Sequence, residues 1–212
     1  MTRGDVGAGT GRPRPRLLLR PFDPARSGDR AAVLDICVRT GDAGGDASAL
    51  HSDPRMLTDR YATPYLDLEP WFAVVAELDG SVVGYVLGTA DSARFAERFR
   101  VHPSSLTEAE RREHARGLVP PEAGGFPAHL HVDLLPVAQG RGVGRMLVEA
   151  FVAALPPSTT GVHLVVDPAN PGALAFYPRV GFEPLASRPD GVVFGRRMRG
   201  APRVSRTAAS AT

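Results

Sequence analysis

Gln-Gly-Arg-Gly-Val-Gly at positions 139–144 is the stretch on which the fold assignment of this chain depends. It lies between an apolar, strand-like segment (Leu130 to Leu135) and an amphipathic, helix-like segment (Arg145 to Leu155). Where a strand breaks into a turn and then opens a helix, several backbone N–H groups at the helix start have no partner. These donors and the positive end of the helix dipole attract phosphate, and glycine lets a pyrophosphate approach the backbone. The stretch therefore predicts a binding site for a phosphate-bearing ligand.

The glycine spacing separates three classes of phosphate-binding loop. A dinucleotide fingerprint requires Gly-x-Gly-x-x-Gly, which the spacing at 140, 142 and 144 does not match. A Walker loop requires a lysine, and all 25 basic residues of this chain are arginine. A third pattern, Gln-x-x-Gly-x-Gly, is matched without a gap by Gln139, Gly142 and Gly144. An ordinary glycine-rich turn is the alternative for this segment taken alone.

A second segment, Asn170 to Tyr177 followed by Gly181-Phe182, predicts a helix and the turn after it. Asn170 suits the N-cap, and Pro171 suits the first helical position because its missing N–H has no partner to lose there. Together with the loop pattern, this segment resembles the GNAT superfamily of acetyl-CoA-dependent acyltransferases, and the resemblance extends from about Arg16 to Met198. It implies the GNAT fold, a mixed α/β (α+β) fold with a central, mostly antiparallel sheet of about seven strands flanked by helices.

Composition limits the class of protein. At 212 residues, with 43% hydrophobic and 23% charged residues, the chain is expected to form one globular domain. There is no run of about 18 apolar residues and no signal-peptide pattern, so neither a membrane span nor export is expected. Cys37 is the one cysteine, which excludes an internal disulfide and fits a cytoplasmic location. A net charge of +2 is too small to indicate nucleic-acid binding.

The predicted domain spans residues 16–199, between two tails, 1–15 and 200–212, that are expected to be disordered. Asp79-Gly80 is a strong hairpin signal between two strand-like segments. Residues 91–127 are expected to form a helical insertion that shapes a binding surface rather than extending the core, with Thr107 and Glu110 in a capping box. The expected strands are Arg16–Phe22, Trp71–Leu78, Val82–Thr89, Leu130–Leu135, Val162–Val166, Gly181–Leu185 and Val192–Met198, and the expected helices are Arg30–Arg39, Asp53–Ala62, Ala109–Leu118, Arg145–Leu155 and the segment after Asn170.

The GNAT resemblance implies direct transfer of acetyl from acetyl-CoA to an amine, and it assigns a set of cofactor-binding residues. The glycine loop and the helix start would bind the pyrophosphate, and strand-edge groups would pair with the pantetheine amides, as in β-augmentation. The residues so assigned are Leu134, Leu135, Val137, Gln139, Gly140, Arg141, Gly142, Val143, Gly144, Arg145 and Asn170. For Asn170, the capping role alone is a sufficient alternative explanation.

Tyr177 matches the family tyrosine that lies near the thioester sulfur, so the resemblance implies that it is the acid that protonates the departing thiolate. Pro178 follows directly, which disfavours helical geometry at Tyr177 and removes a backbone donor to Leu174. The helix is therefore expected to end or kink at the tyrosine. A half-buried tyrosine that only packs is the alternative.

Asp133 is the candidate base or amine anchor. On an extended strand His129, His131 and Asp133 share one face, while the apolar side chains at positions 130, 132 and 134 share the other. A polar face on a central strand costs free energy unless it faces a cleft or finds partners. A salt bridge to an arginine, an exposed edge or a bulge would also explain the pattern, and His131 is a weaker candidate than Asp133. The same His-x-His-x-Asp pattern permits a metal site, although no metal is expected inside an acyl-CoA motif.

Further aromatic segments would line the acceptor side: Asp59 to Tyr61, Pro64-Tyr65 and Pro70 to Phe72. With Val132-Asp133 they resemble bacterial GNAT proteins related to the C-terminal acetyltransferase-like domain of O-GlcNAcase. The chain is therefore interpreted as a cytoplasmic N-acetyltransferase that acts on a primary amine of a small molecule or a peptide.

The expected partners are acetyl-CoA and this amine. Neither nucleic acid nor a membrane is expected, and the chain is expected to be a monomer or a homodimer. The main alternative is a non-catalytic relative that binds acyl-CoA or a protein partner through the same fold. A nucleotide-binding regulator is disfavoured by the absence of lysine and by the glycine spacing.

Overall fold

A computed structural model of the chain describes residues 15–189 and 191–198. The two tails predicted to be disordered, 1–15 and 200–212, lie outside these residues apart from Pro15. Seven strands form one sheet in the order β1-β2-β3-β4-β5-β7-β6. The strands are β1 (Leu17–Pro21), β2 (Val74–Leu78), β3 (Ser81–Thr89), β4 (Ala128–Leu134), β5 (Gly161–Val166), β6 (Glu183–Arg188) and β7 (Gly191–Arg197).

Helices connect and cover these strands. The α-helices are α1 (Ser27–Arg39), α2 (Arg55–Tyr61), α3 (Thr63–Leu68), α4 (Ser92–Val101), α5 (Glu108–Gly117), α6 (Val143–Ala154) and α7 (Pro171–Arg179). Three short 3₁₀ helices are η1 (Pro70–Phe72), η2 (Pro121–Gly125) and η3 (Pro136–Ala138). Within the described ranges, no helix has the length and apolar character needed to cross a membrane.

Neighbouring strands pair antiparallel everywhere except between β4 and β5, which are parallel. This one parallel pairing joins only Ala128 to Val162 and His129 to His163. Beyond it, β4 continues to Leu134 and β5 to Val166, and these two strands, both within the described residues, do not pair further with each other. The sheet is therefore mixed and mostly antiparallel, as predicted, and it splits between its two central strands.

Local signals in the sequence are reproduced where the backbone needs them. Asp79 and Gly80 both have positive φ, 50° and 86°, as a two-residue type I′ turn between β2 and β3 requires. Thr107 and Glu110 form the predicted capping box at the start of α5. Trp71 was expected in a strand, but it lies in η1, because Pro70 opens a 3₁₀ turn that delays the strand to Val74.

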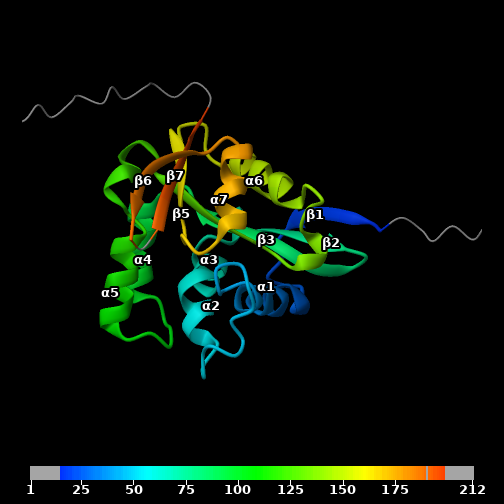
Figure 1. Cartoon of the computed structure of the whole chain (residues 1–212). Coiled ribbons are helices and arrows are strands. Elements are labelled where there is room, and N and C mark those ends of the chain that lie inside the picture. Colours follow the sequence, from blue (N-terminus) through cyan, green and yellow to red (C-terminus); the bar gives the residue numbers. More distant parts are fainter. Residues whose placement is uncertain (1–14, 190, 199–212) are drawn as a thin grey trace, which may run out of the picture.

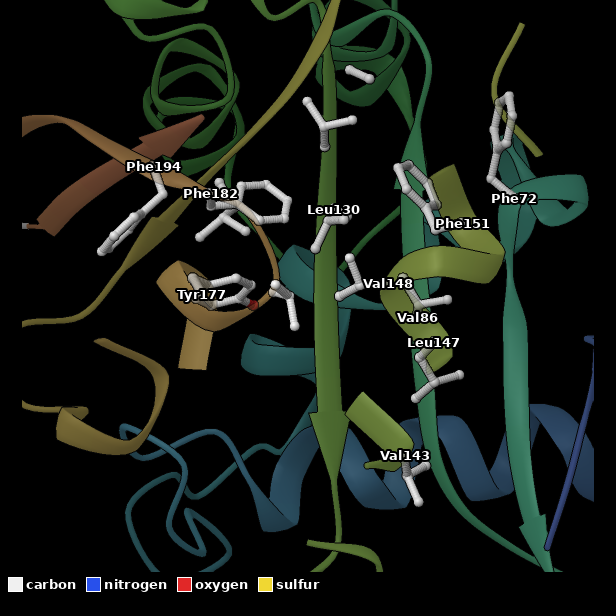
Figure 2. Packing of buried hydrophobic residues seen from close by; sticks show 14 of the residues in the cluster. Phe72, Val86, Leu130, Val143, Leu147, Val148, Phe151, Tyr177, Phe182 and Phe194 are labelled. Carbon is white, nitrogen blue, oxygen red and sulfur yellow. The ribbon is translucent and has the colours of Figure 1, made fainter. Parts of the chain in front are cut away.

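The helices form a layer on each face of the sheet. In Figure 1, α6 and α7 lie on one side of the sheet, and α1, α2 and α3 lie on the other. Figure 2 shows the first layer, in which Leu147, Val148 and Phe151 of α6 face the strands. On the second side a separate apolar cluster joins Val33 and Ile36 of α1 to side chains of α3, α4 and α5. Alternation along β3 separates the two cores, because Val86 points into the first and Tyr85 into the second.

The insertion at residues 91–127 differs from its prediction. It contains two helices, and its first, α4, was not expected; Asp91 caps α4 by accepting from the N–H of Arg94 at 3.0 Å. Phe95 and Phe99 of α4 are fully buried in the second apolar cluster. The insertion thus extends the core through α4, contrary to the expectation, because α4 presents two aromatic side chains one turn apart to the sheet. Its second part also lines a cavity, as expected, through His114, Gly117, Leu118 and Pro120.

Gly88 on β3 provides a test of this packing. A methyl group there would lie 2.3 Å from the carbonyl oxygen of His129 and 2.5 Å from the ring of Phe151. We expect Gly88→Ala to lower the free energy of unfolding by about 3 kcal/mol, because neither the backbone of β4 nor α6 can yield that far. Chemical denaturation measures the change.

The matched control is Gly117→Ala at the end of α5, where an added methyl group meets nothing within 4 Å. Alanine favours helical backbone by about 0.5–1 kcal/mol over glycine, so this control should unfold at the same or a slightly higher denaturant concentration. Equal stability of the two variants would contradict the close approach of β3, β4 and α6.

Candidate functional site

The start of α6 presents a row of backbone donors. Gly142 is the N-cap, with φ of 79°, and Gly140 before it has φ of 70°. The first backbone bond of the helix runs from Met146 N–H to the oxygen of Gly142, at 3.1 Å. The N–H groups from Gly140 to Arg145 donate to no acceptor in the described part of the chain. They lie at the positive end of the helix dipole, which makes the turn suited to an anion.

Glycine is required in this turn for two different physical reasons. A Cβ atom added at Gly140 or Gly142 would meet nothing within 4 Å, so there the positive φ selects glycine and the approach to the amides is open. Gly144 instead has ordinary helical backbone, and its Cβ would lie 3.1 Å from the ring of Phe176 and 3.4 Å from Leu134. Gly144 thus lets α7 and the end of β4 pack closely against α6.

The remaining side chains of the turn hold it in place. Gln139 donates from Nε2 to the carbonyl oxygen of Leu134 at 3.0 Å and so ties the loop to the end of β4. Val143 is buried in the first apolar core. Arg145 donates to the carbonyl oxygen of Arg179, the last residue of α7. Arg141 is exposed and forms no hydrogen bond or ion pair with a described residue.

The end of β4 carries the other predicted cofactor-binding positions. Leu135 donates its N–H to Val83 of β3 at 2.9 Å, and its oxygen accepts from Ala138. Because backbone groups alternate along a strand, those of Leu134 point to the opposite side, into the split beside β5. Val137, in η3, is half exposed. The N–H of Leu135 is therefore already bonded within the protein. The N–H of Leu134 has no acceptor among the described residues, while its carbonyl oxygen accepts from Gln139.

A cavity of about 480 Å³ opens at the split. This volume is in the range of small-molecule sites. The cavity is lined by the polar face of β4 and by side chains from β5, α2, α5 and the start of α7, including His131, Asp133, His163, Tyr61, His114 and Asn170. Asn170 caps α7 as predicted, accepting from the N–H of Ala173 at 2.9 Å.

Asp133 lies on the polar face of β4, as predicted, and accepts a hydrogen bond from Tyr85 Oη at 2.6 Å. Burial raises the pKa of this carboxyl, and the hydroxyl groups of Tyr85 and Thr40 partly offset the rise by stabilising its charge. Burial and the Asp133 charge raise the pKa of Tyr85 well above its ordinary range, so Tyr85 remains a donor. Sequence reasoning did not find Tyr85, because it becomes Asp133's partner only through the pairing of β3 with β4.

Histidine side chains surround Asp133 and are neutral at pH 7. Burial, and then the neighbouring His114 and His163, lower the pKa of His131 to about 3. Burial and the charge of Arg60 lower the pKa of His114 to about 4. His129 and His163 shift in the same direction for the same main reason. Within the described residues, no group of three or more His, Cys, Asp or Glu side chains is arranged to hold a metal ion.

Tyr177 approaches the split from α7. Its ring packs against Phe182 and Phe194, and Figure 2 shows its hydroxyl group directed toward β4. Burial, and then the charge of Asp133, raise the pKa of the phenol, which keeps its proton. The hydroxyl group has no hydrogen-bond partner among the described residues. The helix neither ends nor breaks at Tyr177: it includes Pro178 and continues to Arg179.

Comparison with known proteins gives this geometry a family context. The model of the acetyltransferase (GNAT) family matches residues 47–182. The crystal structure of SsHAT is 40% identical, with a TM-score of 0.76, and the match covers 85% of this chain and 98% of that one. O-GlcNAcase of Rattus norvegicus is 24% identical over an alignment of 204 positions, and the match covers 85% of this chain and 22% of that protein.

A PaiA N-acetyltransferase from Thermoplasma acidophilum, solved in complex with coenzyme A, shares the fold at 12% identity. Its TM-score is 0.55, and the match covers 86% of this chain and 99% of that one. The predicted GNAT resemblance, the GNAT fold and the weak similarity to O-GlcNAcase are thereby confirmed. The chain spans less than a quarter of O-GlcNAcase, since 22% of that protein is covered.

The neutral histidines predict an acid-sensitive fold. Between pH 7 and pH 5 the unfolded chain protonates His114, whose ordinary pKa is 6.5, while the folded chain, with a pKa of about 4, does not. The unfolded state then binds more protons, so this residue's contribution to stability is lost as the pH falls, by about 2 kcal/mol over that window.

Replacing this ring by one that does not titrate isolates the effect. His114→Phe keeps the edge contact with Tyr61. We expect the drop in unfolding free energy from pH 7 to pH 5 to be smaller than in the unchanged protein by about 2 kcal/mol, measured by urea titration at each pH. Parallel pH profiles for the two proteins would show that His114 is protonated in the folded state.

Proposed function

This chain belongs to the acetyltransferase (GNAT) family, and from that premise we propose that it transfers the acetyl group of acetyl-CoA to a primary amine of a small molecule or peptide. The observation that carries the proposal is the open row of backbone amides at the start of α6, beside a split sheet and a polar cavity. Acetyl-CoA requires these three features: donors for its pyrophosphate, a strand edge for its pantetheine amides, and a chamber where its thioester meets an acceptor.

The residues present fit this cosubstrate. The amides from Gly140 to Arg145 would bind the pyrophosphate, with Arg141 free to add a charged contact. The N–H of Leu134, whose carbonyl oxygen accepts from Gln139, and the exposed Val137 would contact the pantetheine arm, and Asn170 lines the cavity. Leu135, whose amide bonds to Val83, would contribute packing, and Gln139 would act by holding the loop to β4.

Acetyl-CoA, when bound, supplies an activated acetyl group: a C–N bond forms to the amine as the C–S bond breaks, the sulfur leaves with the bonding electron pair and gains one proton, and the nitrogen loses one. Tyr177 is the proposed donor of the sulfur's proton, because its raised pKa keeps it protonated and its hydroxyl group is unpaired. Asp133 is the proposed anchor of the amine, oriented by Tyr85. Holding both reactants in one cavity supplies rate through proximity.

The charge of the cavity supports an amine acceptor. Its lining contains the carboxylates of Asp133 and Asp167 and, as the one arginine among its described residues, Arg188, which forms an ion pair with Glu122. The lining histidines are uncharged at pH 7. With Asp133 ionised, the cavity would be net negative and would attract a protonated amine to a position beside that carboxylate.

A second candidate function is binding of acyl-CoA, or of a protein partner, without transfer. The weak similarity to O-GlcNAcase, a protein not named for acetyl transfer, favours it. Such a protein needs the α6 amides but not a protonated Tyr177 or a carboxylate facing the thioester. That residues 16–199 act as one domain, that the protein is cytoplasmic and that it is a monomer or homodimer are further predictions made with this function.

Gly142→Glu tests the phosphate site. A carboxylate at the N-cap would occupy the approach to the amides and repel the pyrophosphate, so we expect acetyl-CoA to bind about 100-fold more weakly or not at all. Isothermal titration calorimetry measures the affinity. The matched control is Gly80→Glu in the β2–β3 hairpin, where φ is also positive, 86°, and an added Cβ meets nothing within 4 Å.

The control carries the same backbone strain and the same charge outside the turn. It should retain the affinity of the unchanged protein. Micromolar binding by Gly142→Glu, with a folded circular dichroism spectrum, would place the cosubstrate elsewhere.

Tyr177→Phe tests the proton donor. Release of free thiol from acetyl-CoA is followed with a panel of small amines and peptides, and the best acceptor is used for kinetics. We expect kcat to fall by about 10²-fold or more, with little change in the affinity for acetyl-CoA, because phenylalanine preserves the ring packing but removes the proton. Unchanged kcat would remove Tyr177 from the reaction, and thiol release with no acceptor, alongside tight binding, would favour the non-catalytic function.

A further inference from the structure

A chain of four buried or half-buried side chains, here called the histidine relay, leads from the protein interior to the cavity. It consists of Ser92 on α4, His129 and His131 on β4, and Tyr65 on α3. Ser92 Oγ lies 2.7 Å from the Pro127 carbonyl oxygen and 2.7 Å from His129 Nδ1. Tyr65 Oη lies 2.7 Å from His129 Nε2 and 3.0 Å from His131 Nε2. Tyr65 is completely buried and stacked on Phe95.

The proton positions along the relay follow from its inner end. A carbonyl oxygen has no proton to give, so the hydroxyl group of Ser92 must donate to Pro127. Ser92 Oγ then accepts, and the donor is Nδ1–H of His129. His129 is neutral because burial lowers its pKa well below the ordinary value. Its Nε2 is therefore an acceptor, and Tyr65 donates to it.

The same logic determines the tautomer of His131. The single proton of Tyr65 is directed at His129, so Tyr65 Oη can only accept from His131, and His131 must carry its proton on Nε2. Its Nδ1 is left with a free lone pair. No described residue bonds to this nitrogen, and it is not among the fully enclosed unpaired nitrogens, which within the described residues are His102 Nδ1 and His114 Nε2. His131 lines the cavity together with Asp133.

We propose that the histidine relay locks His131 as the Nε2–H tautomer and presents its Nδ1 to the cavity as the acceptor of the proton that the amine loses during acetyl transfer. This inference rests on the proposed function. Asp133 then holds the incoming ammonium, which releases one proton to solvent in the cavity to become the neutral amine that attacks. His131 takes the second proton as the C–N bond forms. Ser92, His129 and Tyr65 are positioning residues, because they act through His131.

His131 and Tyr177 account for the two protons that move as the acetyl group is transferred. The amine nitrogen becomes strongly acidic as its C–N bond forms, so a weakly basic imidazole suffices to take the proton. The N–H proton passes to Nδ1 of His131, and Tyr177 supplies the separate proton for the sulfur. Each hydrogen bond of the relay is donated in the direction from His131 to Pro127. The relay is therefore polarised to stabilise the positive charge that His131 acquires. Solvent in the cavity then removes one proton from His131 and returns one to Tyr177.

Alternative proton acceptors face the same space. Asp133, Tyr61, His114 and His163 surround His131. Asp133 accepts from Tyr85, His163 Nδ1 bonds to the oxygen of Phe126, and His114 has an enclosed Nε2. His131 is thus the neutral base on β4 whose free nitrogen reaches the cavity beside the proposed anchor.

The tautomer is measured directly by nuclear magnetic resonance of the full chain labelled with ¹⁵N-histidine, at pH 7 and without acetyl-CoA. The signals of His131 are assigned from their loss in His131→Asn. We expect a protonated Nε2 and an unprotonated Nδ1 for His131, and the opposite tautomer for His129. A protonated Nδ1 on His131, or an even mixture of tautomers, would overturn the proposal whether or not the protein is an enzyme.

Tyr65→Phe breaks the relay while keeping the stacked ring. We expect His131 to become a mixture of tautomers and kcat to fall by about 10-fold or more with an unchanged KM for acetyl-CoA, because binding of the cosubstrate does not involve the relay. Ser92→Ala removes the hydrogen bond to His129 Nδ1 and should change the tautomer of His131 and kcat in the same direction. This variant replaces Tyr65→Phe if the latter does not fold. Tyr61→Phe is the control for the tautomer signal, which it should leave unchanged.

The resonance and activity measurements distinguish failure of this inference from failure of the proposed function. If no amine releases thiol in the unchanged protein, the proposed function fails, while the resonance experiment still decides the relay. If the unchanged protein is active and Tyr65→Phe retains its kcat, the role of His131 as proton acceptor is overturned.

Discussion

The separation of β4 from β5 after two paired residues is the constraint on which the site depends. A parallel pair that continued to Leu134 would occupy the backbone groups on that side of β4 and close the cavity. Because the strands diverge, the loop after β4 enters α6 with its amides exposed, and Tyr177 of α7 reaches toward β4 through the same opening. One interruption in the sheet therefore produces the anion site, the strand edge and the chamber together.

The opening would cost free energy if the polar side chains on this face of β4 had no hydrogen-bond partners. Buried polar groups are tolerated when they are hydrogen-bonded, and here His129, His131 and Asp133 obtain partners from Tyr65 and Tyr85 on other elements. The second helical layer thus has two tasks. It buries apolar side chains such as Phe95, and through Tyr65 of α3 it supplies a hydroxyl group that bonds to His129 and His131, while Tyr85 of β3 bonds to Asp133. Stability and site geometry consequently share the same tyrosines.

Burial also sets the protonation of the site. Removal from water disfavours charge on the histidines that line the cavity and on Tyr177 beside the split, and it also raises the pKa of Asp133, which the hydroxyl groups of Tyr85 and Thr40 partly offset. Under the proposed function, such a site would hold a cationic amine at the carboxylate of Asp133 and leave neutral groups to exchange protons. The negative cavity and the positive helix start, facing the same split, are complementary to an amine on one side and a diphosphate on the other.

Features that arise from neighbouring residues could be predicted from the sequence. The glycine turn, the Asp79-Gly80 hairpin, the Asn170 cap, the capping box at Thr107 and the two faces of β4 all depend on interactions within a few positions. Features that join distant segments could not. Tyr85 meets Asp133 across 48 positions and Tyr65 meets His129 across 64, and nothing local specifies either pair. The burial of α4, the occupied amide of Leu135 and the continuation of α7 through Pro178 likewise depend on tertiary packing, because they follow from what each segment lies against.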